Sequence, residues 1–150
     1  MKNLFVTLAV VVATGLAPVL ATGNQPGDPR SEAIFAKQFS GAENVKWTEL
    51  EDQFKKVSFT LGGIRAEAYF SNEGELLGTV RNLFFSQLPL NVIQAVNTKF
   101  SEPVIIEAKE ITNADGTSYR IILEHTDKRY NLKLNSLGEI TDQQKVKIKK

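Results

Sequence analysis

The stretch FKKVSFTLGGIRAEAYFSNEGELLG, residues 54–78, decides the fold class of this 150-residue chain. Two runs within it, residues 54–61 and 64–70, alternate apolar and polar side chains on either side of Gly62 and Gly63. Alternation with a period of two is typical of a strand with one buried face, and Gly-Gly between two such runs favours a tight hairpin. The turn SNEGE then leads into another apolar run, residues 76–80. The stretch therefore predicts three successive antiparallel strands.

The residues before this stretch add a strand and a helix. Residues 45–50 (VKWTEL) also read as a strand, and EDQ connects them to the hairpin. Further upstream, Asp28 stands before Pro29, which is the usual arrangement at the start of a helix. Phe35 and Phe39 belong to an apolar stripe at helical spacing. One helix followed by four strands is the predicted order.

A similar order returns in the second half of the chain. Residues 86–100 (SQLPLNVIQAVNTKF) have helical spacing, with Pro89 suited to the first turn. Strands are expected at residues 104–111, 118–124, 129–134 and 139–149, and KLNSLGEITD (133–142) echoes YFSNEGELLG (69–78). The sequence therefore predicts an α+β fold of two tandem repeats. Each repeat would have one helix followed by about four antiparallel strands, with the helices packed on one face of the sheet.

The predicted domain organisation follows from these repeats. Residues 1–21 are expected to form a signal peptide and residues 22–30 a linker, followed by a first repeat at 31–83 and a second at 84–150. A unit of about sixty residues is marginal as an independent core. We therefore expect residues 31–150 to form one cooperative domain.

The first twenty-one residues have the pattern of an export signal. Lys2 supplies a positive charge, residues 4–12 are apolar, and the small residues Val19 and Ala21 fit a cleavage site. An uncleaved anchor is the alternative, although the apolar run is short for a membrane span. A periplasmic or secreted protein, with no membrane association after cleavage, is the expectation.

Composition excludes several classes of function. The chain has no cysteine, which excludes disulfides, thiol catalysis and thiolate metal sites. Loss of Lys2 with the signal peptide leaves equal numbers of basic and acidic residues. Binding to nucleic acid through phosphate contacts needs a basic footprint, so no nucleic-acid partner is expected.

Candidate catalytic and metal-binding residues all have simpler interpretations. His125 is the single histidine and lacks a second ligand at helical spacing, so it is interpreted as a turn residue. The carboxylates Glu49, Glu51 and Asp52 lie at a predicted polar hairpin, and TNADGT (112–117) is explained by turn chemistry. No catalytic residue, metal or cofactor is predicted, and the protein is not expected to be an enzyme.

The first half resembles the PepSY-like, β-lactamase-inhibitor-protein-like (BLIP-like) domains of exported bacterial proteins. That pattern is a helix ending in an aromatic residue, then Gly-Ala, Val-x-Trp, an alternating strand and an aromatic before a glycine turn. The matching residues are Phe39, Gly41, Ala42, Val45, Trp47, Val57, Phe59, Tyr69, Phe70, Asn72 and Gly74. The resemblance covers roughly residues 31–149 and is sharper in the first repeat. It implies a tandem α/β architecture and carries over no catalytic residue.

An open sheet face is the predicted binding site. A sheet with helices on one face leaves the other face to solvent, and parity places polar residues there. The candidate residues are Lys46, Arg65, Glu67, Tyr69, Arg120, Glu124 and Lys133. An ordinary solvated sheet face is the alternative interpretation of the same residues. Trp47 is expected in the core, and of Phe84 and Phe85 one is expected to pack inward.

The predicted function is an exported module that binds another envelope or extracellular protein, including an enzyme that it inhibits. An envelope structural or stress protein without a client is the alternative, followed by a small hydrolase.

Overall fold

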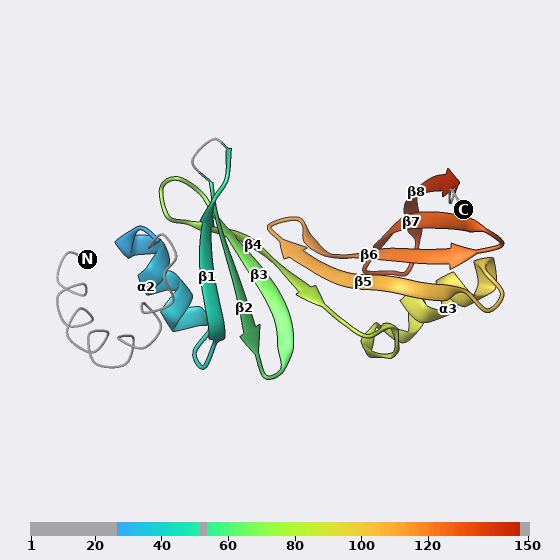
Figure 1. The fold of residues 1–150 in the computed structure, drawn as a ribbon, viewed down its shortest axis with the longest axis horizontal. Coiled ribbons are helices and arrows are strands. Elements are labelled where there is room, and N and C mark those ends of the chain that lie inside the picture. Colours follow the sequence, from blue (N-terminus) through green and yellow to red (C-terminus); the bar gives the residue numbers. More distant parts are fainter. Residues whose placement is uncertain (1–26, 52–53, 148–150) are drawn as a thin grey trace. The chain divides into compact units, whose positions relative to one another are not determined.

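The computed structural model describes residues 27–51 and 54–147, and these form two α-helices, one short 3-10 helix and eight strands (Figure 1). In chain order they are α2 (Pro29–Gln38), β1 (Glu43–Glu49), β2 (Lys55–Leu61), β3 (Ile64–Phe70), β4 (Leu76–Asn82), η3 (Phe85–Gln87), α3 (Leu90–Lys99), β5 (Val104–Asn113), β6 (Gly116–His125), β7 (Lys128–Asn135) and β8 (Ile140–Lys147). The chain divides into two compact units between Leu77 and Gly78. The predicted signal peptide lies outside the described residues.

The predicted fold class, an α+β fold of two tandem repeats, is wrong. The eight strands form one antiparallel sheet in the order β1 to β8, and the molecule is mostly sheet. Gly78–Asn82 of β4 pair with residues 109–113 of β5, the strand that follows the second helix. The fourth strand therefore connects the first three strands to those that follow α3 within one sheet, and the strands do not fall into two repeats of four. Its ladder is long-range, which the local periodicity of a sequence does not reveal.

In the first unit, α2 packs against β1, β2 and β3. The strands bury alternate residues, among them Val57, Phe59 and Phe70, as the alternation of the sequence predicts. Phe35 of α2 lies 5.0 Å from Phe59 and 5.7 Å from Trp47, measured between ring centroids. Edge-on aromatic contacts of this kind add to the stabilisation that burial supplies. The expectation that Trp47 belongs to the core is confirmed.

In the second unit, α3 packs against the strands that follow it. Val92 and Val96 are fully buried on the helix, and Ile121 of β6 and Leu132 of β7 are fully buried on the sheet. Phe85 packs against this core whereas Phe84 is 77% exposed, so the expectation for this pair is confirmed. Among the described residues, none belongs to both cores.

The start of α3 is held by the turn between β7 and β8. Asn91 donates a hydrogen bond of 2.9 Å from Nδ2 to the carbonyl oxygen of Ser136. Gly138 in the same turn has a φ of +83°, and a Cβ there would come within 2.7 Å of the carbonyl oxygen of Asn91. Glycine is therefore required twice, by the backbone conformation and by the close approach of the helix.

Candidate functional site

The open face of the first unit carries the four candidate residues that were predicted for it. Lys46 and Arg65 are exposed, while Glu67 and Tyr69 are partly buried on β3. Strand register places Lys46 opposite Ser58, and Ser58 opposite Glu67. Lys46 and Glu67 therefore occupy one row across β1, β2 and β3.

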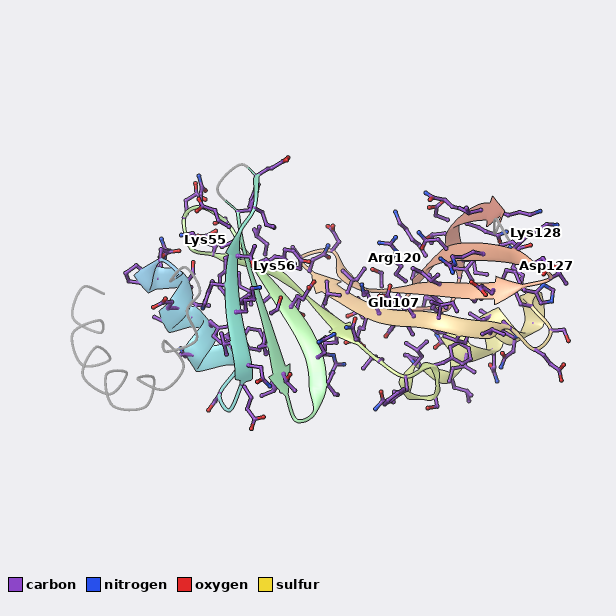
Figure 2. The ribbon with its side chains drawn as sticks, viewed as in Figure 1. Lys55, Lys56, Glu107, Arg120, Asp127 and Lys128 are labelled. Atoms are coloured by element: carbon purple, nitrogen blue, oxygen red, sulfur yellow. The ribbon has the colours of Figure 1, made fainter. Side chains whose placement is uncertain are left out.

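Glu67 and Tyr69 form a polar network with Lys56 of β2, which Figure 2 labels. The Tyr69 hydroxyl donates a 2.7 Å hydrogen bond to Glu67 Oε2, and Lys56 Nζ lies 3.5 Å from Glu67 Oε1. Burial, together with the hydrogen bond and negative charge of Glu67, raises the pKa of Tyr69 to about 12. The tyrosine is thus neutral at physiological pH, and its ring is oriented by a hydrogen bond.

Tyr69 also lines an apolar hollow of about 620 Å³. The other lining residues are Leu50, Glu51, Phe54 and Leu77. The three apolar ones are between 37% and 44% exposed, so a large part of each side chain meets solvent. We refer to these five residues, with Glu67 and Lys56, as the Tyr69 surface.

Sequence reasoning identified Tyr69 and missed Leu50, Phe54 and Leu77. Leu50 and Phe54 flank the polar residues of the β1–β2 connection, and Leu77 precedes a glycine in β4. In the sequence each reads as an ordinary strand residue, because the pattern does not show that these three segments come together around Tyr69. The available signal is that all three are large apolar residues at or beside the ends of strands.

The second unit carries its three candidate residues on β6 and β7. Arg120 and Lys133 are directly opposite each other in the register, whereas Glu124 lies near the end of β6. Glu124 forms an ion pair with Arg129, its register partner, with 2.6 Å between Glu124 Oε1 and Arg129 Nη2. Arg120 donates from Nε to Asn131 Oδ1 at 3.1 Å.

A second hollow, of about 340 Å³, lies over Arg120 and Lys133. The rest of its lining is polar at Ser118, Asn135 and Thr141 and apolar or aromatic at Ile111, Tyr119 and Leu134. Lys109 of β5 is the register partner of Arg120, so Lys109, Arg120 and Lys133 stand in one row across three strands. We call these three residues the cation row.

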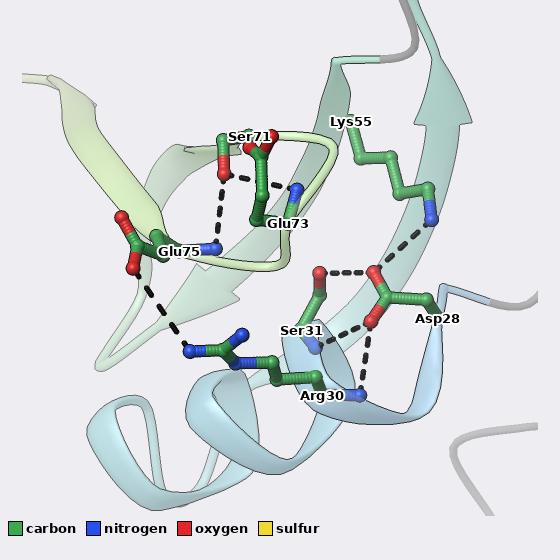
Figure 3. Close-up of polar contacts among 7 residues, drawn as sticks. All are labelled: Asp28, Arg30, Ser31, Lys55, Ser71, Glu73 and Glu75. Carbon is green, nitrogen blue, oxygen red and sulfur yellow. Dashed lines mark hydrogen bonds and ion pairs between the residues drawn. The ribbon is translucent and has the colours of Figure 1, made fainter.

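A third polar group surrounds the start of α2 (Figure 3). The Asp28 carboxylate accepts hydrogen bonds from the backbone N–H of Arg30 and Ser31 and from the Ser31 hydroxyl, and Lys55 Nζ lies 3.0 Å away. Burial acts to raise the pKa of Asp28, but the bonds from Ser31 and Lys55 outweigh it and hold the pKa well below its usual range. Burial and the nearby Asp28 charge raise the pKa of Glu32. This group caps and anchors the helix.

The other residues considered for chemistry occupy structural positions. His125 ends β6, and its ring packs edge-on against Phe100 with centroids 5.7 Å apart. Glu49 and Glu51 are exposed, and Asp52 lies outside the described residues. Within residues 27–51 and 54–147, no cluster of three or more His, Cys, Asp or Glu could hold a metal ion. No helix in that part of the chain has the length and apolar character to cross a membrane.

Solved structures from Bacteroides share this fold. A BLIP-like protein of B. fragilis is 19% identical, with a TM-score of 0.73 over 86% of this chain and 93% of that one. A DUF2874 family protein of B. ovatus is 16% identical, with a TM-score of 0.73 over 81% of this chain and 89% of that one. A B. eggerthii protein described as periplasmic is 15% identical, also at 0.73, covering 81% and 90%.

These likenesses support the BLIP-like part of the sequence resemblance at the level of the fold. No protein-family model matches the chain, and no curated protein matches its sequence. The PepSY-like part of the resemblance stays a prediction.

Proposed function

We propose that this chain is an exported, non-catalytic module that binds another protein through the Tyr69 surface. The observation that carries the proposal is the hollow lined by Leu50, Phe54, Tyr69 and Leu77, where large apolar side chains remain open to solvent. Such residues beside a polar rim are typical of the centre of a protein interface.

The chemistry of the surface defines the partner. An apolar side chain of the partner would fill the hollow, and a basic group beside it would face Glu51, which is exposed in the lining. Tyr69 suits the centre because its orientation is fixed by Glu67, so little conformational entropy is lost on binding. The partner is therefore a protein that presents an apolar anchor flanked by a lysine or arginine.

The location of the partner follows from the export signal of the sequence. Residues 1–21 have the pattern of a signal peptide, and one protein of the same fold is described as periplasmic. We place the interaction in the periplasm or outside the cell, with an envelope enzyme as the class of partner that an inhibitor-like module would modulate.

The test starts with capture from an envelope extract, followed by titration of the purified partner. Tyr69→Ala should weaken binding by about 30-fold, which corresponds to about 2 kcal/mol for an interface anchor. Tyr69→Phe keeps the ring and should lose much less. Lys37→Ala, at an exposed position of α2 outside the lining of the hollow, is the control.

Two results would overturn the proposal. One is a partner whose affinity is the same for Tyr69→Ala and the parent protein. The other is the absence of any saturable partner, which would favour a structural role in the envelope. Thermal unfolding of each variant establishes that a loss of binding does not come from a loss of the fold.

A further inference from the structure

The cation row places like charges at directly opposite positions of neighbouring strands. Two other register pairs of this unit carry opposite charges, Arg81 with Glu110 and Arg129 with Glu124, each with a 2.6 Å contact, whereas Lys128 is the register partner of Lys147. In the row, Lys109 faces Arg120 and Arg120 faces Lys133. Like charges at directly opposite positions destabilise a sheet. This arrangement therefore lowers stability unless something compensates for it.

Compensation by the protein itself is incomplete. Lys109 is paired with Glu107, labelled in Figure 2, at 2.9 Å. Asp142 is the register partner of Lys133, yet among the described residues no ion pair joins Lys133 or Arg120 to a carboxylate. In that part of the chain, Arg120 thus has only the neutral acceptor Asn131, and Lys133 faces Asp142 without an ion-pair contact.

The same two cations line the hollow of about 340 Å³. Its volume falls in the range of small-ligand pockets. Arg120 offers a planar guanidinium, which matches the geometry of a carboxylate or phosphate, and Lys133 offers a mobile point charge. The Ser118 hydroxyl in the lining adds a neutral donor.

We propose that Arg120 and Lys133 bind an oxyanion, the carboxylate or phosphate group of a small ligand, in this hollow. The bound anion would place a negative charge close to both Arg120 and Lys133, and its attraction to both would offset the repulsion between them. The Tyr69 surface has no part in this site, and the proposal holds whether or not the chain binds a protein.

The experiment compares the thermal unfolding of the full mature chain in phosphate, acetate and chloride at equal ionic strength. At ten times the dissociation constant, an anion bound only by the folded state should raise Tm on the order of 5 °C. Arg120→Gln combined with Lys133→Gln should remove the increase. Lys99→Gln combined with Lys145→Gln removes two exposed lysines outside the row and should retain it.

The pattern of Tm increases tells whether the site exists and which class of anion it binds. An increase in phosphate alone assigns a phosphate ligand, and an increase in acetate alone assigns a carboxylate. No increase over chloride, or an increase that the Arg120 and Lys133 double variant retains, overturns the site. The comparison with the variant removes the general stabilisation that phosphate gives to any folded protein. Lys133→Gln alone, at an exposed position, serves if the double variant does not fold.

Discussion

Asp28 concentrates several stabilising contacts in one side chain. It satisfies two backbone N–H groups at the start of α2, which have no partner within the helix, and it also pairs with Lys55 of the neighbouring strand. The cap and the ion pair therefore both stabilise the docked helix. The ion pair requires the negative charge of Asp28 whereas the helix cap does not, so an uncharged substitute can separate their contributions to stability.

Asp28→Asn should separate them. Asparagine is an equally good helix cap, so this variant loses the charge and keeps the cap. The folded-state pKa of Asp28 lies below its unfolded value of about 3.9, so its charge stabilises the fold above that pH and the effect is lost as pH falls through the folded pKa. We expect Asp28→Asn to lower the unfolding free energy by about 1 kcal/mol at pH 7 and to narrow the gap from the parent below about pH 4.

Denaturant titrations across this pH range measure the difference. Glu32 has a raised pKa, so its ionisation lowers the free energy of unfolding as pH rises, which is the opposite of the effect of Asp28. Glu32 is present in both the parent and the variant, but its pKa depends in part on the Asp28 charge. Asp115→Asn is the control, because it changes one acid in a turn where asparagine is equally suited. A gap between Asp28→Asn and the parent that does not narrow in acid would contradict the assigned ion pair.

At the scale of elements, the junction of α3 with the β7–β8 turn depends on Gly138. Gly41 has the same φ of +83°, but an added Cβ there meets nothing within 4 Å. Gly41→Ala should therefore cost only the backbone strain of the left-handed region, about 1 kcal/mol. Gly138→Ala should cost at least about 2 kcal/mol more, because the helix must also move away from the new methyl group.

Equilibrium denaturation of the two alanine variants, with the parent alongside, tests this pair. Equal losses of unfolding free energy at Gly41 and Gly138 would show that the contact with Asn91 is not restrictive. A larger loss at Gly138 confirms that this turn positions the first turn of α3.

The elements could be predicted from the sequence, while their pairing could not. Alternation located β3 at residues 64–70, and Asp28 with Pro29 marked the start of α2, because both signals are local. The pairing of β4 with β5 spans the whole of α3, and no local pattern encodes it.

The candidate site could be predicted only in part for the same reason. Parity places Tyr69 on the open face, but parity within one strand does not show that Leu50 and Leu77, which lie on other segments, line the same hollow.

At the scale of the whole molecule, we expect the two units to unfold together. The described part of the first unit has about fifty residues, a size at which an independent core is marginal. β4 begins at Leu76 in the first unit and continues to Asn82 in the second, so one strand contributes backbone to both. Unfolding of either unit would remove order from a strand that the other one uses.

Trp47 makes this expectation measurable, because it is the single tryptophan and lies in the first unit. Leu132→Ala opens a cavity at a fully buried site of the second unit and should cost about 2–5 kcal/mol. If unfolding is cooperative, Trp47 fluorescence and far-ultraviolet circular dichroism should move to the same lower midpoint, although Trp47 is not in the mutated core. Leu137→Ala, at a position 72% exposed in the same unit, should leave both midpoints unchanged. A Trp47 transition that keeps its parental midpoint, while circular dichroism shows a separate earlier one, would establish that the units unfold independently.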